Sequence, residues 1–232
     1  MLLKYMKNIS IEVKTGNITH QNVDLLINSS NTYLLLGSGT AEQIRKSGGE
    51  LSKDNEEYRI LKHRTSQENP VLGKVLDYID TTERLPSKAQ NMRLRYIIEN
   101  GSRELELGDA VLLPSGDLSN IPERAKYVSD AIGMTYDWKI QPKPPTIPAT
   151  FTSVMDSLTK SFYKAAELRC KSIAMPPMCI RKGGLTLEES ARASKEALKV
   201  LDGTTVERIE VVLYNEELAG EVDKFRKLYE DF

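Results

Sequence analysis

Apolar residues recur along the chain with two spacings, and the two kinds of segment alternate. Short alternating or continuous apolar runs predict strands at 9–13, 23–27, 111–113, 127–132, 172–175 and 209–214. Helical spacing predicts helices at 40–61, 152–169, 186–201 and 216–229. Gly48-Gly49 should interrupt or divide the first helix, and Thr186 should cap the third with Glu189 as its capping-box partner. This alternation predicts an α/β fold with a largely parallel or mixed sheet that helices cover on its faces.

Two segments depart from this alternation. Residues 62–106 are polar and irregular, and 83–103 contain five basic residues against two acidic ones. Strand-like composition at 74–79 and 94–98, with turn-like sequence between them, predicts a hairpin there. Residues 141–150 contain four prolines, so we expect a stiff, extended surface loop.

Composition narrows the class of protein. With 232 residues and 40% hydrophobic content, the chain can bury one sizeable core, or one core plus a large excursion. A net charge of -1 gives no overall field that favours DNA or an anionic membrane, so a nucleic-acid role would need a local basic patch. Two cysteines and no long apolar run predict a cytoplasmic protein without a membrane span. Two histidines far from both cysteines predict no metal site.

A candidate anion site follows the second predicted strand. Asn28-Ser29-Ser30-Asn31 indicates an amide-rich turn, and Gly37-Ser38-Gly39 leads into the helix that begins at Thr40. Glycines let backbone N–H groups approach a phosphate, and the helix dipole adds partial positive charge. The asparagine side chains could hold hydroxyl groups or the loop itself. On spacing alone, an ordinary turn is the alternative.

Several motifs, in the same order along the chain, resemble those of the macro domain, a module that binds ADP-ribose. The family's opening, usually GDIT and then VDAIVNAAN, is matched by Gly16-Asn17-Ile18-Thr19 and residues 23–31. Its first phosphate loop and helix are matched by residues 34–49, and later motifs by 108–111, 115–118, 127–128 and 172–176. The resemblance implies a three-layer α/β/α sandwich with a mixed, mostly parallel central sheet. We expect residues 1–232 to form one macro-like domain with an inserted excursion at about 62–106.

The resemblance also implies a ligand site across the strand ends, with no cofactor. Asn17 would face the adenine amino group, with Ile18 beside it, and Tyr214 would pack on the adenine. Asn28 and Asn31 would frame the distal ribose. The diphosphate would lie between two loops, Gly37-Ser38-Gly39-Thr40 and Cys179-Ile180-Arg181-Lys182-Gly183-Gly184.

The chain departs from the family pattern inside both parts of this site. Asn17 replaces the usual aspartate and loses a charge-assisted bond to adenine, so the substitution Asn17→Asp should strengthen binding by about 1 kcal/mol. Arg181 replaces a glycine of the second loop, and Arg181 and Lys182 could hold phosphate by side-chain charge. A solvated loop tip is the alternative for these two residues. No histidine follows Cys179, which favours a buried inert thiol over a nucleophile.

Other departures concern catalysis. Hydrolysis of an ADP-ribosyl bond needs a positioned water and a group that polarises or deprotonates it. Ala41 stands where the hydrolytic branch carries its acid, and Asp130 where a histidine is usual. Asn31 is the candidate to orient a water. Asp109 or Asp117 could lie near the expected ligand site at the strand ends, but such residues are more often turn or cap residues.

Three functions follow from these features. The first is a module that binds ADP-ribose or a related nucleotide diphosphate through two phosphate loops, with ADP-ribose or ADP-ribosylated protein as partner. The second is a hydrolase that removes ADP-ribose from protein or acts on its 1″-phosphate, which the alanine at position 41 opposes. The third is a macro-like scaffold with a decayed site, in which the basic insertion and the proline loop contact protein or nucleic acid.

Overall fold

The chain folds around one mixed sheet in a computed structural model that describes residues 9–51, 55–81, 87–101, 103–137, 145–214 and 220–230. The strands are β1 (Ser10–Thr15), β2 (Leu25–Asn31), β3 (Ala110–Pro114), β4 (Tyr127–Tyr136), β5 (Thr146–Ile147), β6 (Ser172–Met175) and β7 (Arg208–Leu213). Their order is β1-β7-β6-β2-β4-β3, with β5 paired to β4. Neighbouring strands are parallel except that β3 and β5 run antiparallel to β4. This confirms the predicted mixed, mostly parallel sheet.

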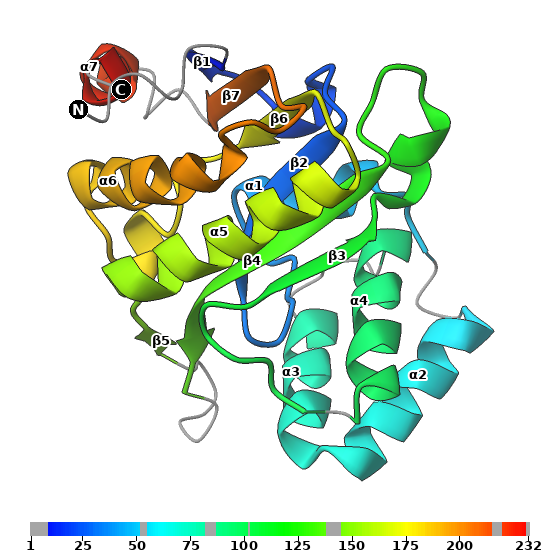
Figure 1. The fold of residues 1–232 in the computed structure, drawn as a ribbon. Coiled ribbons are helices and arrows are strands. Elements are labelled where there is room, and N and C mark those ends of the chain that lie inside the picture. The colour runs from blue at the N-terminus through cyan, green and yellow to red at the C-terminus, as the bar shows by residue number, and fades with distance from the viewer. Residues whose placement is uncertain are drawn as a thin grey trace.

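Helices cover both faces of the sheet and make a three-layer α/β/α sandwich (Figure 1). One face carries α5 (Phe151–Glu167) and α6 (Leu187–Leu198), and α7 (Val222–Glu230) lies beside α6 and β1. The other layer contains α1 (Thr40–Ser47), α2 (Glu56–Glu68), α3 (Pro70–Thr81) and α4 (Lys88–Glu99). Short 3-10 helices connect these elements: η1 (Ile18–His20), η2 (Gly116–Asn120), η3 (Arg181–Gly183) and η4 (Lys199–Leu201).

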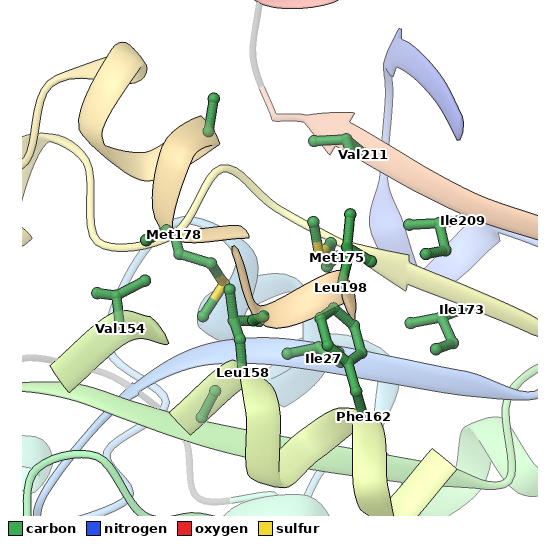
Figure 2. Packing of buried hydrophobic residues seen from close by; sticks show 14 of the residues in the cluster. Ile27, Val154, Leu158, Phe162, Ile173, Met175, Met178, Leu198, Ile209 and Val211 are labelled. Carbon is green, nitrogen blue, oxygen red and sulfur yellow. The ribbon is translucent and has the colours of Figure 1, made fainter. Parts of the chain in front are cut away.

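Alternate residues of the central strands point to opposite layers. Leu25 and Ile27 belong to the core beneath α5 and α6, whereas Leu26 between them packs with Ile44 of α1. Figure 2 shows the first of these cores, where side chains of α5 and α6 gather over β2, β6 and β7. Strands β2, β6 and β7 are therefore covered by apolar packing on both faces of the sheet, as is usual for parallel strands.

The capped helices are where the sequence pattern placed them. Thr186 and Glu189 form the predicted capping box of α6. The predicted first helix is divided into α1 and α2, and Gly48 is the C-cap of α1. The last helix begins at Val222, later than predicted, and 215–219 lie outside the described residues. Of the predicted proline loop, Thr146–Ile147 forms β5 and 141–144 lie outside the described residues.

The predicted hairpin within 62–106 is wrong, because both of its arms are helices, α3 and α4. Their apolar residues repeat at helical spacing, as Leu72, Val75 and Leu76 show, and these side chains are buried in a third core. That core also contains Leu34 and Leu35 of the chain that leads to the glycine loop. The β-branched residues suggested strands, but burial of one helical face decided the structure.

The predicted amide-rich turn at 28–31 is also wrong. Strand β2 continues through Asn31 and pairs with β4, Asn28 opposite Asp130 and Ser30 opposite Ile132. Three of these polar side chains have hydrogen bonds that offset their burial in a central strand: Asn28 donates to Asp130 Oδ1, Ser29 Oγ accepts from the Cys179 N–H, and Asn31 Nδ2 donates to the Leu35 carbonyl.

Candidate functional site

A cavity of about 350 Å³ lies at the carboxyl ends of four parallel strands. Its walls contain Asn31 at the end of β2, Tyr136 at the end of β4, Pro176 after β6 and Tyr214 after β7. Ligands of open α/β sheets bind at this edge, where the loops after the strands converge. Neighbouring strands are about 4.8 Å apart, so the three steps from β7 to β4 span roughly 14 Å. The cavity is therefore elongated across the sheet.

The start of α1 forms one wall. Gly37, Ser38, Gly39, Thr40 and Ala41 all line the cavity. Gly39 is the N-cap of α1, with φ 60° and ψ -132°, and no side chain caps the helix there. The first N–H groups of a helix have no intrahelical partner, and here they adjoin an open space with the positive end of the helix dipole behind them.

The segment after β6 forms the opposite wall, with Pro176, Pro177 and the run Cys179-Ile180-Arg181-Lys182-Gly183. Arg181 has a left-handed φ of 58°, so the chain keeps a backbone shape typical of glycine although an arginine stands there. Arg181 and Lys182 line this space and are exposed. They give the cavity a positive edge opposite the start of α1.

Cys179 is a packing residue of this wall. It is only 3% exposed, its N–H donates to Ser29 Oγ at 3.1 Å, and its Sγ lies 3.4 Å from the same oxygen. Burial raises the pKa of the Cys179 thiol to about 11. A β-carbon on Gly133 would lie 2.4 Å from Sγ, so the thiol fills the space that this glycine leaves. The thiol is therefore protonated at neutral pH, in keeping with the predicted inert cysteine.

Asn31 lines the cavity but uses its amide within its own loop. Oδ1 accepts from the N–H groups of Tyr33 at 3.1 Å and Leu35 at 3.2 Å, and Nδ2 donates to the Leu35 carbonyl at 3.1 Å. The side chain thus fixes the chain that leads from β2 to the glycine loop. This arrangement favours a structural role for Asn31 over the predicted orientation of a catalytic water.

Asn28 does not reach the cavity. It is fully buried and its Nδ2 donates to Asp130 Oδ1 at 2.7 Å. Asp130 is itself fully buried and forms an ion pair with Arg93 of α4, with 2.8 Å between Nη2 and Oδ2. The predicted contact between Asn28 and the distal ribose is therefore not supported, because this amide satisfies a buried carboxylate.

Asn17 and Ile18, predicted at the adenine, lie outside the cavity lining. Asn17 Oδ1 caps η1, accepting from the N–H of Thr19 at 2.9 Å and from its Oγ1 at 2.7 Å. The Ile18 N–H donates to Gln43 Oε1 at 3.1 Å. Tyr214 is the predicted adenine contact that does line the cavity, and its side chain is partly exposed.

The described residues that line the cavity include no carboxylate and no imidazole. Asp109 pairs with Lys160, and Asp117 pairs with Lys88 at 2.8 Å, both away from the lining.

The sequence did not predict three residues of the site, Leu35, Met134 and Tyr136, which form the end of the cavity near β4. The one feature of the sequence that could have indicated them is their position shortly after the ends of predicted strands. The cavity therefore combines the uncapped start of α1 and two cationic residues with an apolar end.

Comparisons with known proteins agree with the observed fold. The macro domain family model matches residues 85–194, which include α4 but not α2 or α3. The Oceanobacillus iheyensis macrodomain with ADP superposes with a TM-score of 0.58 at 18% identity, over 98% of this chain and 95% of that one. The Trypanosoma brucei macrodomain in complex with ADP-ribose gives 0.58 at 15% identity, over 98% and 69%. The chain has a macrodomain fold.

Sequence relatives of this chain are distant but align over nearly its whole length. An uncharacterized protein of Sulfolobus acidocaldarius is 23% identical, with 100% of this chain and 97% of the relative aligned. A macro domain-containing protein of Caldanaerobacter subterraneus is 22% identical, over 95% and 96%. None of the helices that the structure describes is long and apolar enough to span a membrane.

Proposed function

We propose that this macrodomain binds ADP-ribose or a related nucleotide diphosphate in the cavity at the strand ends. The observation that carries the proposal is the pairing of two walls, the uncapped start of α1 and the cationic loop at Arg181 and Lys182. Backbone N–H groups at a helix start and side-chain cations both favour a diphosphate. Neighbours with this fold were solved with ADP-ribose and with ADP, which supports the same ligand class.

The order of the strands suggests how such a ligand would lie. Tyr214 follows β7, the two diphosphate walls lie near β6 and β2, and Tyr136 ends β4. The base would pack on Tyr214, the diphosphate would lie between the loops, and the second ribose would reach Leu35, Met134 and Tyr136. The roughly 14 Å between β7 and β4 gives room for these three parts in a row.

Binding rather than hydrolysis is the activity we propose. A hydrolase needs a group that polarises or deprotonates water, and the described cavity lining offers neither a carboxylate nor an imidazole. The raised pKa of the Cys179 thiol, about 11, also disfavours a thiolate nucleophile. We therefore expect no release of ADP-ribose from a mono-ADP-ribosylated protein in a turnover assay.

Isothermal titration calorimetry with ADP-ribose, ADP and AMP tests this proposal. We expect ADP-ribose to bind most tightly and AMP least, because each added part meets one more section of the cavity. Gly39→Val should weaken binding of both diphosphates, since φ 60° at the N-cap of α1 strongly disfavours a branched side chain. Gly203→Val is a matched control, with a positive φ of 72° at a turn away from the cavity. Equal affinity for ADP-ribose and AMP would refute the proposal.

A further inference from the structure

We propose that Gln90 of α4 is a positioning residue that fixes the glycine loop of the cavity. Gln90 is 2% exposed, and its amide contacts the backbone on both sides of Leu35. Oε1 accepts from the Leu36 N–H at 2.8 Å, and Nε2 donates to the Leu34 carbonyl at 3.2 Å. The residue after Leu36 is Gly37, the first residue of the glycine loop that lines the cavity. The inference rests on the proposed function only where it concerns ligand affinity.

The chain before Gly37 needs such a support. Leu34 has a left-handed φ of 52°, a conformation that persists in a non-glycine residue only where its surroundings enforce it. Asn31 holds the start of this turn through its bonds to Tyr33 and Leu35. Gln90 holds the far end, adjacent to Gly37, so the two amides fix the turn from opposite sides.

Helix α4 gives Gln90 a rigid base. Ser87 caps the helix, accepting from the Gln90 N–H at 3.1 Å, and the Arg93 side chain one turn later forms its buried ion pair with Asp130 of β4. The Arg93–Asp130 ion pair therefore fixes α4 to the sheet one turn from Gln90, the residue that holds the glycine loop. A carboxamide supplies one acceptor and one donor on the same carbon, which is what the Leu36 N–H and Leu34 carbonyl require together.

Two substitutions at Gln90 test this role. Gln90→Met keeps the length and apolar packing but removes both hydrogen bonds. Gln90→Glu keeps an acceptor for the Leu36 N–H and, when ionised, loses the donor to Leu34. Asn91→Ala is the matched control, because Asn91 is a buried amide on the same helix for which no bond to the glycine loop is seen among the described residues. Urea denaturation checks that each variant is folded.

Hydrogen–deuterium exchange of the free protein and calorimetry with ADP-ribose are the two readouts. In Gln90→Met we expect exchange at residues 36–41 to be at least tenfold faster and ADP-ribose affinity to be about tenfold weaker. Gln90→Glu should give a smaller change in both, and Asn91→Ala should leave both at the parent values. Exchange at distant strands such as β7 should be the same in all four proteins.

Unchanged exchange at residues 36–41 in Gln90→Met would overturn the proposal. Faster exchange with unaltered affinity would also overturn it, because the loop geometry would then not matter for the ligand. If the parent protein does not bind ADP-ribose, the proposed function fails. The exchange data would still decide whether Gln90 fixes the loop.

Discussion

Replacing Arg93 with leucine should expose the cost of an unpaired carboxylate inside this fold. Both side chains of the Arg93–Asp130 pair are 0% exposed, with 2.8 Å between Nη2 and Oδ2. Without Arg93, Asn28 still donates to Asp130 Oδ1 at 2.7 Å, but no positive charge faces this carboxylate among its described hydrogen-bond partners. Removing one partner of a buried ion pair typically costs about 3–5 kcal/mol, because the other charge stays buried. For a domain of this size that loss corresponds to a fall in Tm of roughly 6–20 °C.

The loss should depend on pH in a defined direction. Burial raises the pKa of Asp130 above its ordinary value, while Arg93 and then Asn28 oppose the rise. In Arg93→Leu the larger opposing charge is gone, so the pKa of Asp130 in the folded state should rise further. A group whose folded pKa exceeds its unfolded pKa favours folding at low pH, and this contribution is lost as pH rises through the folded pKa. The variant should therefore be closer to the parent at pH 5 than at pH 8.

Urea denaturation at both pH values measures this difference in the free energy of unfolding. Arg95→Leu is the control, because Arg95 lies on the same helix and pairs with Glu57 at the surface, where its side chain is 55% exposed. An exposed pair of this kind contributes about 0–1 kcal/mol. A loss in Arg93→Leu no larger than in Arg95→Leu, or one that is equal at pH 5 and pH 8, would refute this reasoning.

Three further predictions concern the cavity and its surroundings. The double variant Arg181→Ala, Lys182→Ala should bind ADP-ribose more weakly and lose most of the salt dependence seen in calorimetry at low and physiological salt, because exposed cations are screened by salt; parent-like binding at both salt concentrations would make this loop a solvated tip. Arg181→Gly should be more stable to urea than Arg181→Ala by about 1 kcal/mol, since φ is 58° there, and equal midpoints would contradict this. The gain of about 1 kcal/mol that the sequence predicts for Asn17→Asp is no longer expected, because Oδ1 already accepts two bonds from Thr19, and ADP-ribose affinity should stay within about threefold; a gain of about fivefold or more would instead place residue 17 against the base.

Much of the fold was readable from local patterns. The strands β2, β6 and β7 are short apolar runs, and α6 carries a complete capping box at Thr186 and Glu189. The sequence predicts strands where α3 and α4 lie, because short runs such as 94–98 combine β-branched residues with helical spacing and local composition cannot distinguish a strand from a helix there. Their partners, Tyr33 to Leu35 and β3, lie outside both helices in the sequence, and packing against them decides the outcome.

The location of the candidate site could be predicted from the sequence, but most of its hydrogen-bond contacts could not. Glycines at 37 and 39 and the loop at 179–183 signalled the two walls, and both line the cavity. The roles of individual amides were not readable, because each depends on a partner distant in sequence. Asn28 binds Asp130, 102 positions away, and Gln90 binds the backbone 54 positions before it. Sequence spacing does not report which side chain satisfies a buried polar group.

A titration of the ¹⁵N-labelled protein with ADP-ribose, followed by amide chemical shifts, tests the central claim most directly. The claim is that one ligand lies between the start of α1 and the loop after β6. We predict that amides of 37–41 and 179–183 shift together and saturate at one common ligand concentration, with smaller changes at Tyr214 and Tyr136. Shifts confined to residues outside the cavity, or no shifts at millimolar ADP-ribose, would contradict it.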